Sequence, residues 1–353
     1  MSFLKKLDVY GIGNALVDID FEISHHTLER LNIEKGVTTL ITSDRQLELL
    51  EELTGTKHIK TCGGSVANTI MITTLLGGKT FYSCKVANDT FGVFFYEELI
   101  HNGVGTNLRR ETLPHGTTGV CLVLVTKDAA RTMNTHLGIT ETLSCHELNE
   151  QAIAESQYLY IEGYLATSPT GSEAAIRAYE IAQAYQTKIA LSLSDPNIVK
   201  YYHARLMEMM GNGIDLLFCN EPEAKLLCQT DNLQEVCRRL QTFAKTFAIT
   251  QGPRGSLIYD GSNIYDIAAH DVPVIDTVGA GDMYEGGFLH SITHGHDYET
   301  AGIIADIVAS RVVSKFGPRL NRQEAQEVSV EIAEFLAIQN HLDFSKKLEW
   351  ELA

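Results

Sequence analysis

The sequence predicts an α/β fold in which a mainly parallel central sheet is covered by helices on both faces. Runs rich in apolar and β-branched residues recur along the 353 residues, and segments with helical periodicity separate them. Several of these runs are apolar throughout, which is typical of strands buried on both faces of a parallel sheet. No Pro- or Gly-rich linker divides the chain, so we expect residues 1–353 to form a single domain.

The expected strands follow from these runs in chain order. They are 9–12, 79–86, 119–125, 158–161, 188–192, 216–219 and 246–250. Helical periodicity is clear between them, for example over 172–185, where Ala175, Tyr179 and Ala182 fall on one side of a helix. This alternation of strand and helix is the pattern of βαβ units.

Two segments do not fit the alternation. The first, at about 17–41, begins with strand-like Ile19, Phe21 and Ile23, and the second, at about 117–137, contains the runs CLVLVT and RTMNTHL. We expect both to pair into a small β-sheet inserted in the α/β core. A sheet that stands off the main layer in this way would act as a lid over a site.

The charge of the chain excludes several classes of partner. There are 28 Lys and Arg against 45 Asp and Glu, a formal net charge of −17 at pH 7. Such an acidic surface repels phosphate backbones and anionic lipid headgroups, and no basic run offsets it. The sequence also has neither a membrane-spanning apolar stretch nor a signal peptide, so we expect a cytoplasmic protein with no nucleic acid or membrane partner.

The strongest local signal is the heptapeptide DTVGAGD at 276–282, which precedes a helix-compatible run. The small residues Gly279, Ala280 and Gly281 allow backbone N–H groups to converge at a helix N-terminus, where they bind an anion such as a transferring phosphate. Asp282 would accept the proton of an attacking hydroxyl group as a general base. An Asp that caps a helix after a Gly-rich turn is the structural alternative.

A second group of motifs lies near the N-terminus. Gly63 and Gly64 form a turn that leads into a helix, and the amide of Asn68 offers a donor and an acceptor to a polyol. Asn14 follows a Gly-Ile-Gly segment, but Leu16 stands where a dinucleotide-binding fingerprint has its third glycine, so a Rossmann site is excluded. The glycines instead allow a strand end to approach a ligand closely.

Asp18 and Asp20 are two residues apart, which on a strand places both carboxylates on one face. Such a pair can bind vicinal hydroxyl groups. A solvated strand face is the alternative, and we prefer it for Asp20.

Two further turns follow apolar strands in the second half of the chain. Asn220 and Glu223 stand at the start of an expected helix with Pro222 in its first turn, where they would either face a metal-bound phosphate or cap the helix. The segment 250–255 lies between two strands and by itself indicates only a hairpin turn.

Together these segments resemble the ribokinase, or PfkB, family of carbohydrate and nucleoside kinases. The similarity runs in order from Gly11 to about Gly317 and rests on two signatures, GGSVANT at 63–69 and DTVGAGD followed by MYEGGF. The resemblance implies a ribokinase-like fold with a small β-sheet lid and transfer of the γ-phosphate of ATP to a hydroxymethyl group. It also implies a requirement for Mg²⁺.

The resemblance implies roles for individual residues as well. Asp282 matches the catalytic base, and Gly279, Ala280 and Gly281 match the anion hole. The candidates for contacts with the acceptor are Asn14, Asp18, Gly63, Gly64 and Asn68. The candidates on the nucleotide side are Asn220, Glu223, Thr250, Gly252 and Gly255, where Glu223 would organise Mg²⁺ through water.

Two further roles concern charge near the phosphate. Arg131, on the expected lid strand, matches an arginine that lies over the transferring phosphate and neutralises it. Asp276 and Val278 would supply carbonyl oxygens to a monovalent cation such as K⁺. One position departs from the family, since Asp306 stands where many members have Asn near the adenine.

The acceptor is expected to be a nucleoside, adenosine first. The segments RTMNTHLG and YIEGYL are most similar to bacterial proteins of the adenosine-kinase branch, and Met133 and Tyr164 would offer apolar or aromatic surface to a purine. A phosphosugar is disfavoured, because 13–23 contains no cation for a second phosphate. The alternatives are a ribose or fructose kinase and a non-catalytic nucleoside- or sugar-binding module. The protein is expected to be a monomer or a homodimer, because lids in the family either close over their own site or clasp a second subunit.

Overall fold

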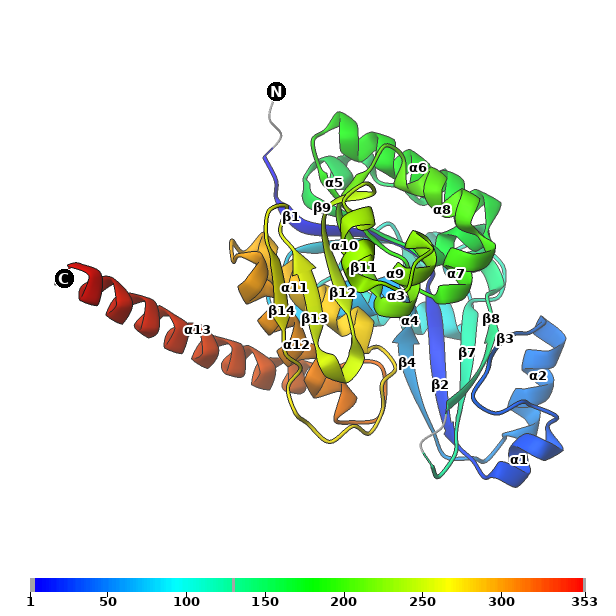
Figure 1. The fold of residues 1–353 in the computed structure, drawn as a ribbon. Helices are drawn as coiled ribbons and strands as arrows, with labels where there is room; N and C mark the ends of the chain where they lie inside the picture. Colours follow the sequence, from blue (N-terminus) through cyan, green and yellow to red (C-terminus); the bar gives the residue numbers. More distant parts are fainter. Residues whose placement is uncertain (1–3, 129–130, 352–353) are drawn as a thin grey trace.

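The computed structural model describes residues 4–128 and 131–351, with side chains of the last helix described as far as residue 339. Two sheets organise this part of the chain (Figure 1). In spatial order, the larger sheet contains β14 (Ile264–Ile267), β13 (Ser256–Tyr259), β12 (Ala244–Thr250), β11 (Ile214–Asn220), β10 (Lys188–Ser192), β9 (Ser156–Glu162), β1 (Leu7–Ile12), β5 (Thr80–Ser83) and β6 (Gly105–Thr106).

The larger sheet is mainly parallel. All neighbouring pairs from β12 to β6 are parallel, and only β13 and β14 are added antiparallel in the part of the chain that is described. Six of the seven predicted strands lie in this sheet, and the run at 119–125 forms a strand of the smaller one. The α/β fold predicted from the continuous apolar runs is therefore confirmed.

Helices cover both faces of the larger sheet. One face packs against α5 (Glu150–Ala154), α6 (Pro169–Ala184), α7 (Pro196–Tyr201), α8 (His203–Met210), α9 (Glu221–Cys228) and α10 (Leu233–Leu240). The other packs against α3 (Ser65–Leu75), α4 (Thr90–Asn102), α11 (Ala280–Thr293) and α12 (Tyr298–Val313). Strand side chains alternate between the two cores: along β9, Leu159 joins the first and Tyr160 the second.

The C-terminal helix α13 (Arg322–Glu351) starts against α12 and α3 and then projects away from the body (Figure 1). Its first turns bury Ala325, Val328 and Ile332 in a third apolar cluster with α12. Across the described residues, no helix combines the length and the apolar character needed to cross a membrane.

The smaller sheet contains, in order, β3 (Thr38–Leu40), β8 (Arg131–His136), β7 (Gly119–Val125), β2 (Leu16–Glu22) and β4 (His58–Gly63). The predicted lid segments at 17–41 and 117–137 supply four of these strands. β4 comes from outside them and was not predicted, because its sequence HIKTCG is polar and its first three residues are exposed. The first segment also contains the helix α1 (His25–Arg30).

The two faces of the smaller sheet differ. One face of β2 places Ile19 and Phe21 in the same apolar cluster as Leu28 of α1 and Leu49 of α2 (Ser43–Glu52). The opposite face of β2 carries Asp18 and therefore faces away from these helices.

Two consecutive glycines allow α11 to approach both of its neighbours. A Cβ at Gly286 would collide with Ile72 Cγ2 and lie 2.7 Å from the carbonyl oxygen of Thr69, both on α3. A Cβ at Gly287 would lie 3.2 Å from Cα of Ala305 on α12. The contact between α3 and α11 matters for the site, because both helices begin at the same edge of the sheet.

We expect Gly286→Ala to destabilise the fold. The added methyl group has no space between α3 and α11, and overpacking of this kind costs about 1–3 kcal/mol. Thermal unfolding would measure the loss as a lower Tm. Gly281→Ala is the matched control, because no atom lies within 4 Å of its Cβ position; an equal Tm for both variants would contradict the proposed steric role of Gly286.

Candidate active site

Many of the predicted site residues lie at the edge of the larger sheet where its parallel strands end. β1 leads into Asn14, β9 ends at Glu162, β11 at Asn220 and β12 at Thr250. Ligands of open parallel sheets bind at this edge. A cavity of about 90 Å³ there is lined by Asn220, Thr250 and Asp282 together, so the N-terminus of α11 lies at the same edge.

The start of α11 has the geometry of an anion site. Gly279 is the N-cap residue with φ of +77°, and a Cβ there would collide with the carbonyl oxygen of Pro318. Only glycine fits this position. Beyond it, Gly281 is exposed and lines the cavity, and the first N–H groups of a helix have no acceptor within the helix. These donors and the helix dipole favour a bound anion.

Asp282 is fixed from the side of α3. Its Oδ1 accepts a hydrogen bond from Ser65 Oγ at 2.7 Å, and its Oδ2 accepts one from Asn68 Nδ2 at 2.7 Å. Burial raises the pKa of Asp282, while the two hydrogen bonds and the charge of Arg319 lower it. The carboxylate is therefore held in one orientation at the start of the helix.

Asp18 lies near Asp282, on the inner face of the smaller sheet. A Cβ at Gly63 on the neighbouring strand would collide with the Asp18 carboxylate, so glycine makes the space that this side chain occupies. Burial, followed by repulsion from Asp20, raises the pKa of Asp18 to about 7, and Arg319 opposes this rise. The spacing argument from the sequence holds, since Asp18 and Asp20 share one face of β2.

Asn14 is positioned by Glu162, a residue that the sequence analysis did not identify. Glu162 Oε1 accepts hydrogen bonds from the backbone N and from Nδ2 of Asn14, both at 2.7 Å, and Oε2 accepts one from Val66 N at 3.2 Å. Glu162 is fully buried. Gly64, with φ of +99°, lies so close to the carbonyl oxygen of Asn14 that a Cβ would collide with it. Asn14, Asp18, Gly63, Gly64 and Asn68 thus surround one region. We call it the acceptor side, after the role that the resemblance implies for these residues.

The 90 Å³ cavity continues from Asp282 toward the ends of β10 and β11. It is also lined by Glu223 and by Glu285, another residue absent from the sequence predictions. Glu285 accepts hydrogen bonds from Tyr160 Oη and from Ser192 Oγ, the latter at 2.9 Å. Burial raises the pKa of Glu285 to about 8. Asn220, Glu223 and Thr250 line this side of Asp282, and Gly252 and Gly255 follow in the turn after Thr250. We call it the nucleotide side, after the role that the resemblance implies for these residues.

Asn220 and Glu223 cap α9, as the structural alternative predicted. Asn220 Oδ1 accepts from Glu223 N at 2.9 Å, and the two Glu223 carboxylate oxygens accept from Asn220 N and Nδ2 at 2.9 and 2.7 Å. Each oxygen keeps a second lone pair. One carboxylate beside a cavity fits a Mg²⁺ ion that retains water ligands and arrives with phosphates. Within the described ranges, no group of three or more His, Cys, Asp and Glu could hold a metal by itself.

Thr250 and Gly252 line a second and more open hollow of about 920 Å³, between the ends of β11 and β12. Gly252 has φ of +58°, and Gly255 has φ of +85° with no space for a Cβ against the carbonyl oxygen of Ile267.

Asp306, on α12, accepts hydrogen bonds from the backbone N (2.8 Å) and Nδ1 of His270, so its carboxylate fixes the loop after β14.

Arg131 is ion-paired to two carboxylates. Its guanidinium contacts Asp20 Oδ1 at 3.1 Å and also Asp276 Oδ2. Asp20 is therefore paired, and the prediction of a solvated face for this residue was wrong. Asp276 also accepts hydrogen bonds from Val278 N at 3.1 Å and Gly317 N at 2.9 Å, which fixes the loop before α11. Arg131 thus joins the smaller sheet to that loop.

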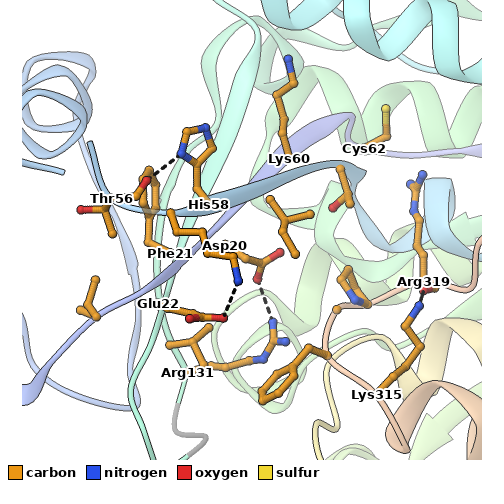
Figure 2. Close-up of a pocket in the computed structure, with 18 of the residues that line it drawn as sticks. Asp20, Phe21, Glu22, Thr56, His58, Lys60, Cys62, Arg131, Lys315 and Arg319 are labelled. Atoms are coloured by element: carbon orange, nitrogen blue, oxygen red, sulfur yellow. Dashed lines mark hydrogen bonds and ion pairs between the residues drawn. The ribbon is translucent and has the colours of Figure 1, made fainter. Parts of the chain in front are cut away.

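A groove of about 1130 Å³ runs along β4, and we call it the β4 groove. Figure 2 shows Asp20 and Arg131 facing each other in it, with Lys315 and Arg319 farther along. Basic residues outnumber acidic ones among its lining residues, although the chain as a whole is acidic. Arg319 was also not predicted as a site residue, since it lies in no motif.

The two predicted purine-contacting residues lie in different surroundings. Met133 packs with Cys121, Val123 and Val125 of β7 in a small cluster separate from the main cores. Tyr164 is half-buried after β9 and packs against the core beside α6. The register of β2, β7 and β8 places the Met133 cluster on the same face as Asp18.

The chain matches the model of the pfkB family carbohydrate kinases over residues 42–325. Adenosine kinase 1 from Arabidopsis thaliana is 24% identical over 327 residues, which cover 86% of this chain and 92% of that protein. A 5-dehydro-2-deoxygluconokinase from Bacillus licheniformis is 25% identical over 358 residues, which cover 95% of this chain and 98% of that protein.

Two solved structures are similar over nearly the whole chain. Adenosine kinase from Sinorhizobium meliloti superimposes with a TM-score of 0.83 at 33% identity and covers 91% of this chain and 98% of its own. A "probable sugar kinase protein" from Rhizobium etli CFN 42 has a TM-score of 0.83 at 31% identity and covers 93% and 100%. The fold is therefore ribokinase-like, and family membership implies ATP as the co-substrate. The chain belongs to the PfkB family of carbohydrate kinases and is a phosphotransferase with an alcohol group as acceptor.

Proposed function

We propose that the protein transfers the γ-phosphate of ATP to the 5′-hydroxymethyl group of a nucleoside, with adenosine as the first candidate. The observation that carries this proposal is the position of Asp282. Its carboxylate receives hydrogen bonds from Ser65 and Asn68 on the acceptor side and also lines the cavity that Glu223 and Thr250 reach from the nucleotide side. A base that accepts the proton of the attacking hydroxyl group must lie where the acceptor meets the γ-phosphate.

In the proposed reaction, the 5′-oxygen attacks the γ-phosphorus, the bond from that phosphorus to the bridging oxygen breaks, and ADP leaves. Asp282 accepts the hydroxyl proton. Backbone N–H groups of 279–281 donate to the phosphoryl oxygens as negative charge accumulates there. Burial raises the pKa of Asp282 and makes it a better proton acceptor, while Ser65 and Asn68 favour its ionised form.

The nucleotide side would hold ATP and its ions. Mg²⁺, when bound with ATP, supplies positive charge to the phosphates. Glu223 and Asn220 would hold it through water, because their mutual hydrogen bonds already fix both side chains. Thr250, Gly252 and Gly255 would lie under the nucleotide, and the carbonyl oxygens of Asp276 and Val278 would bind K⁺.

The acceptor side supports a nucleoside. Asp18 would bind the vicinal hydroxyl groups of ribose, and the apolar cluster around Met133 on the same sheet face would contact the base. The S. meliloti and A. thaliana relatives are adenosine kinases. A free-sugar kinase acting on ribose or fructose is the second candidate, since the B. licheniformis relative is a kinase of a sugar derivative.

The smaller sheet would act as the lid over this site. Its outer face is covered by α1 and α2 of the same chain, as the cluster of Phe21 with Leu28 and Leu49 shows. A lid clasped to a second subunit through that face would have to displace these helices. This favours a monomer with a lid that closes over its own site.

We expect Asp282→Asn to lower kcat by about 10²–10⁴-fold, because the variant lacks the base, while ligand binding is largely retained. Steady-state kinetics and calorimetric binding of adenosine would measure the two effects. Asp266→Asn, on the exposed face of β14, is the control. Full turnover by the Asp282 variant would remove it as the base. Binding of adenosine without any turnover by the wild type would instead support the non-catalytic binding module.

The choice of acceptor is tested by ATP-dependent ADP release with adenosine, guanosine, inosine, ribose and fructose. We expect the highest kcat/KM for adenosine, because the Met133 cluster adds apolar contact that a free sugar cannot use. Turnover of a hexose without turnover of any nucleoside would exclude the first candidate and support the second.

We expect Glu162→Gln to raise the KM for the acceptor and to lower Tm. A glutamine amide cannot accept both hydrogen bonds from Asn14 and the one from Val66, and an unsatisfied buried group costs about 1–3 kcal/mol. Kinetics and thermal unfolding would check this against Glu173→Gln, an exposed position on α6. An unchanged KM would show that Asn14 does not contact the acceptor.

A further inference from the structure

Arg319 is linked to the proposed base by a short chain of hydrogen bonds. It lies in the segment between α12 and α13, and its Nε donates to Asn68 Oδ1. Asn68 Nδ2 in turn donates to Asp282 Oδ2 at 2.7 Å. Because Asn68 uses its oxygen for Arg319 and its nitrogen for Asp282, Arg319 also decides which way the amide faces.

The guanidinium of Arg319 is not fully satisfied by the protein. Its Nη2 is buried and has no hydrogen-bond partner among the described residues. A buried donor without a partner costs free energy, so this part of the guanidinium does not contribute to stability. Lys315 Nζ donates to the backbone oxygen of Arg319 at 3.2 Å, which holds the segment against the β4 groove (Figure 2).

The surroundings of Asp282 are otherwise acidic. The titratable groups that face it are Asp18 from β2, Tyr160 and Glu162 from β9, Tyr164 from the turn after β9, Glu285 from α11 and Arg319. Arg319 is the cation in this set. Several buried carboxylates close together favour protonation of some of them, and a protonated Asp282 is no longer a base.

Arg131 does not fill this role in the structure. It is ion-paired to Asp20 and Asp276. Its charge lowers the pKa of Asp18 less than the charge of Arg319 does. The two arginines therefore occupy different positions relative to the base.

We propose that Arg319 is a positioning residue for the transfer, which orients Asp282 through Asn68 and places a positive charge beside Asp282 and Asp18. This inference rests on the proposed function of Asp282 as the base. It assigns to the segment after α12 a part in the reaction that no sequence motif indicated.

The kinetic test compares Arg319→Gln and Arg319→Lys with the wild type across pH. The glutamine variant should lose about 10- to 100-fold in kcat/KM, and its acid limb should move up by about one pH unit, because the cation that lowers the pKa of Asp282 is gone. The lysine variant keeps the charge, so its acid limb should stay near that of the wild type. Arg322→Gln, three residues along and bonded to the His101 backbone oxygen and to Asn102, is the control.

A purely structural role predicts a different result. Activity of Arg319→Gln would then fall equally at all pH values, with the acid limb unmoved, and that outcome overturns the proposal. The double variant Arg319→Gln/Asn68→Ala adds a second criterion, since residues that act through one another lose less together than the sum of their single effects. Additive losses would also overturn it.

A readout without turnover separates this inference from the proposed function. In protein with ¹³C-labelled aspartate carboxyl groups, the signals of Asp18 and Asp282, assigned with Asp18→Asn and Asp282→Asn, report their protonation directly. Arg319→Gln should raise the pKa of both, and unchanged values overturn the proposal even if the wild type is an active kinase. If both pKa values rise but adenosine is not phosphorylated, the electrostatic role of Arg319 holds and the choice of acceptor fails.

Discussion

The site depends on the hydrogen bonds that tie Asp282 of α11 to Ser65 and Asn68 of α3. These residues are more than two hundred positions apart, and they meet because Gly286 lets the two helices approach until a methyl group no longer fits. The strands on which the helices pack all end at the same edge, so the two N-termini open onto one space. Gly279 completes the junction, since its left-handed conformation under Pro318 turns the chain into α11.

The sequence predicts well those features that depend on residues close together in the chain. Continuous apolar runs predict the strands of the larger sheet, and glycine-rich turns predict both helix starts, because glycine is required where φ is positive or a neighbour is too close. Glu162 and Arg319 could not be predicted in the same way. Glu162 acts on a residue 148 positions away and Arg319 on one 251 positions away, and neither lies in a motif. The prediction of a solvated face for Asp20 was wrong for the same reason, since its partner Arg131 is 111 positions away.

The acidic character of the chain is also a property of the site. Four carboxylates, those of Asp18, Glu162, Glu223 and Glu285, have pKa values raised by burial to about 7 or 8. A site of this kind must bind the phosphates of ATP against its own charge. In the proposed function its favourable contacts with phosphate are concentrated at the start of α11. Cations reach the site from segments distant in the sequence, which composition alone does not reveal.

The two arginines near the site belong to different parts of the molecule, and this difference has a mechanical consequence. Arg131 stands on the smaller sheet and pairs with Asp276 of the body, so under the proposed function, in which this sheet is a lid, its charge would move with the lid. Arg319 stands on the body, bonded to Asn68 of α3, and keeps its place beside Asp282 whatever the lid does. A base that must remain ionised before the acceptor is enclosed needs a cation that stays on the body, as Arg319 does. A phosphate that must be neutralised only after the lid closes is better served by a cation on the smaller sheet, such as Arg131.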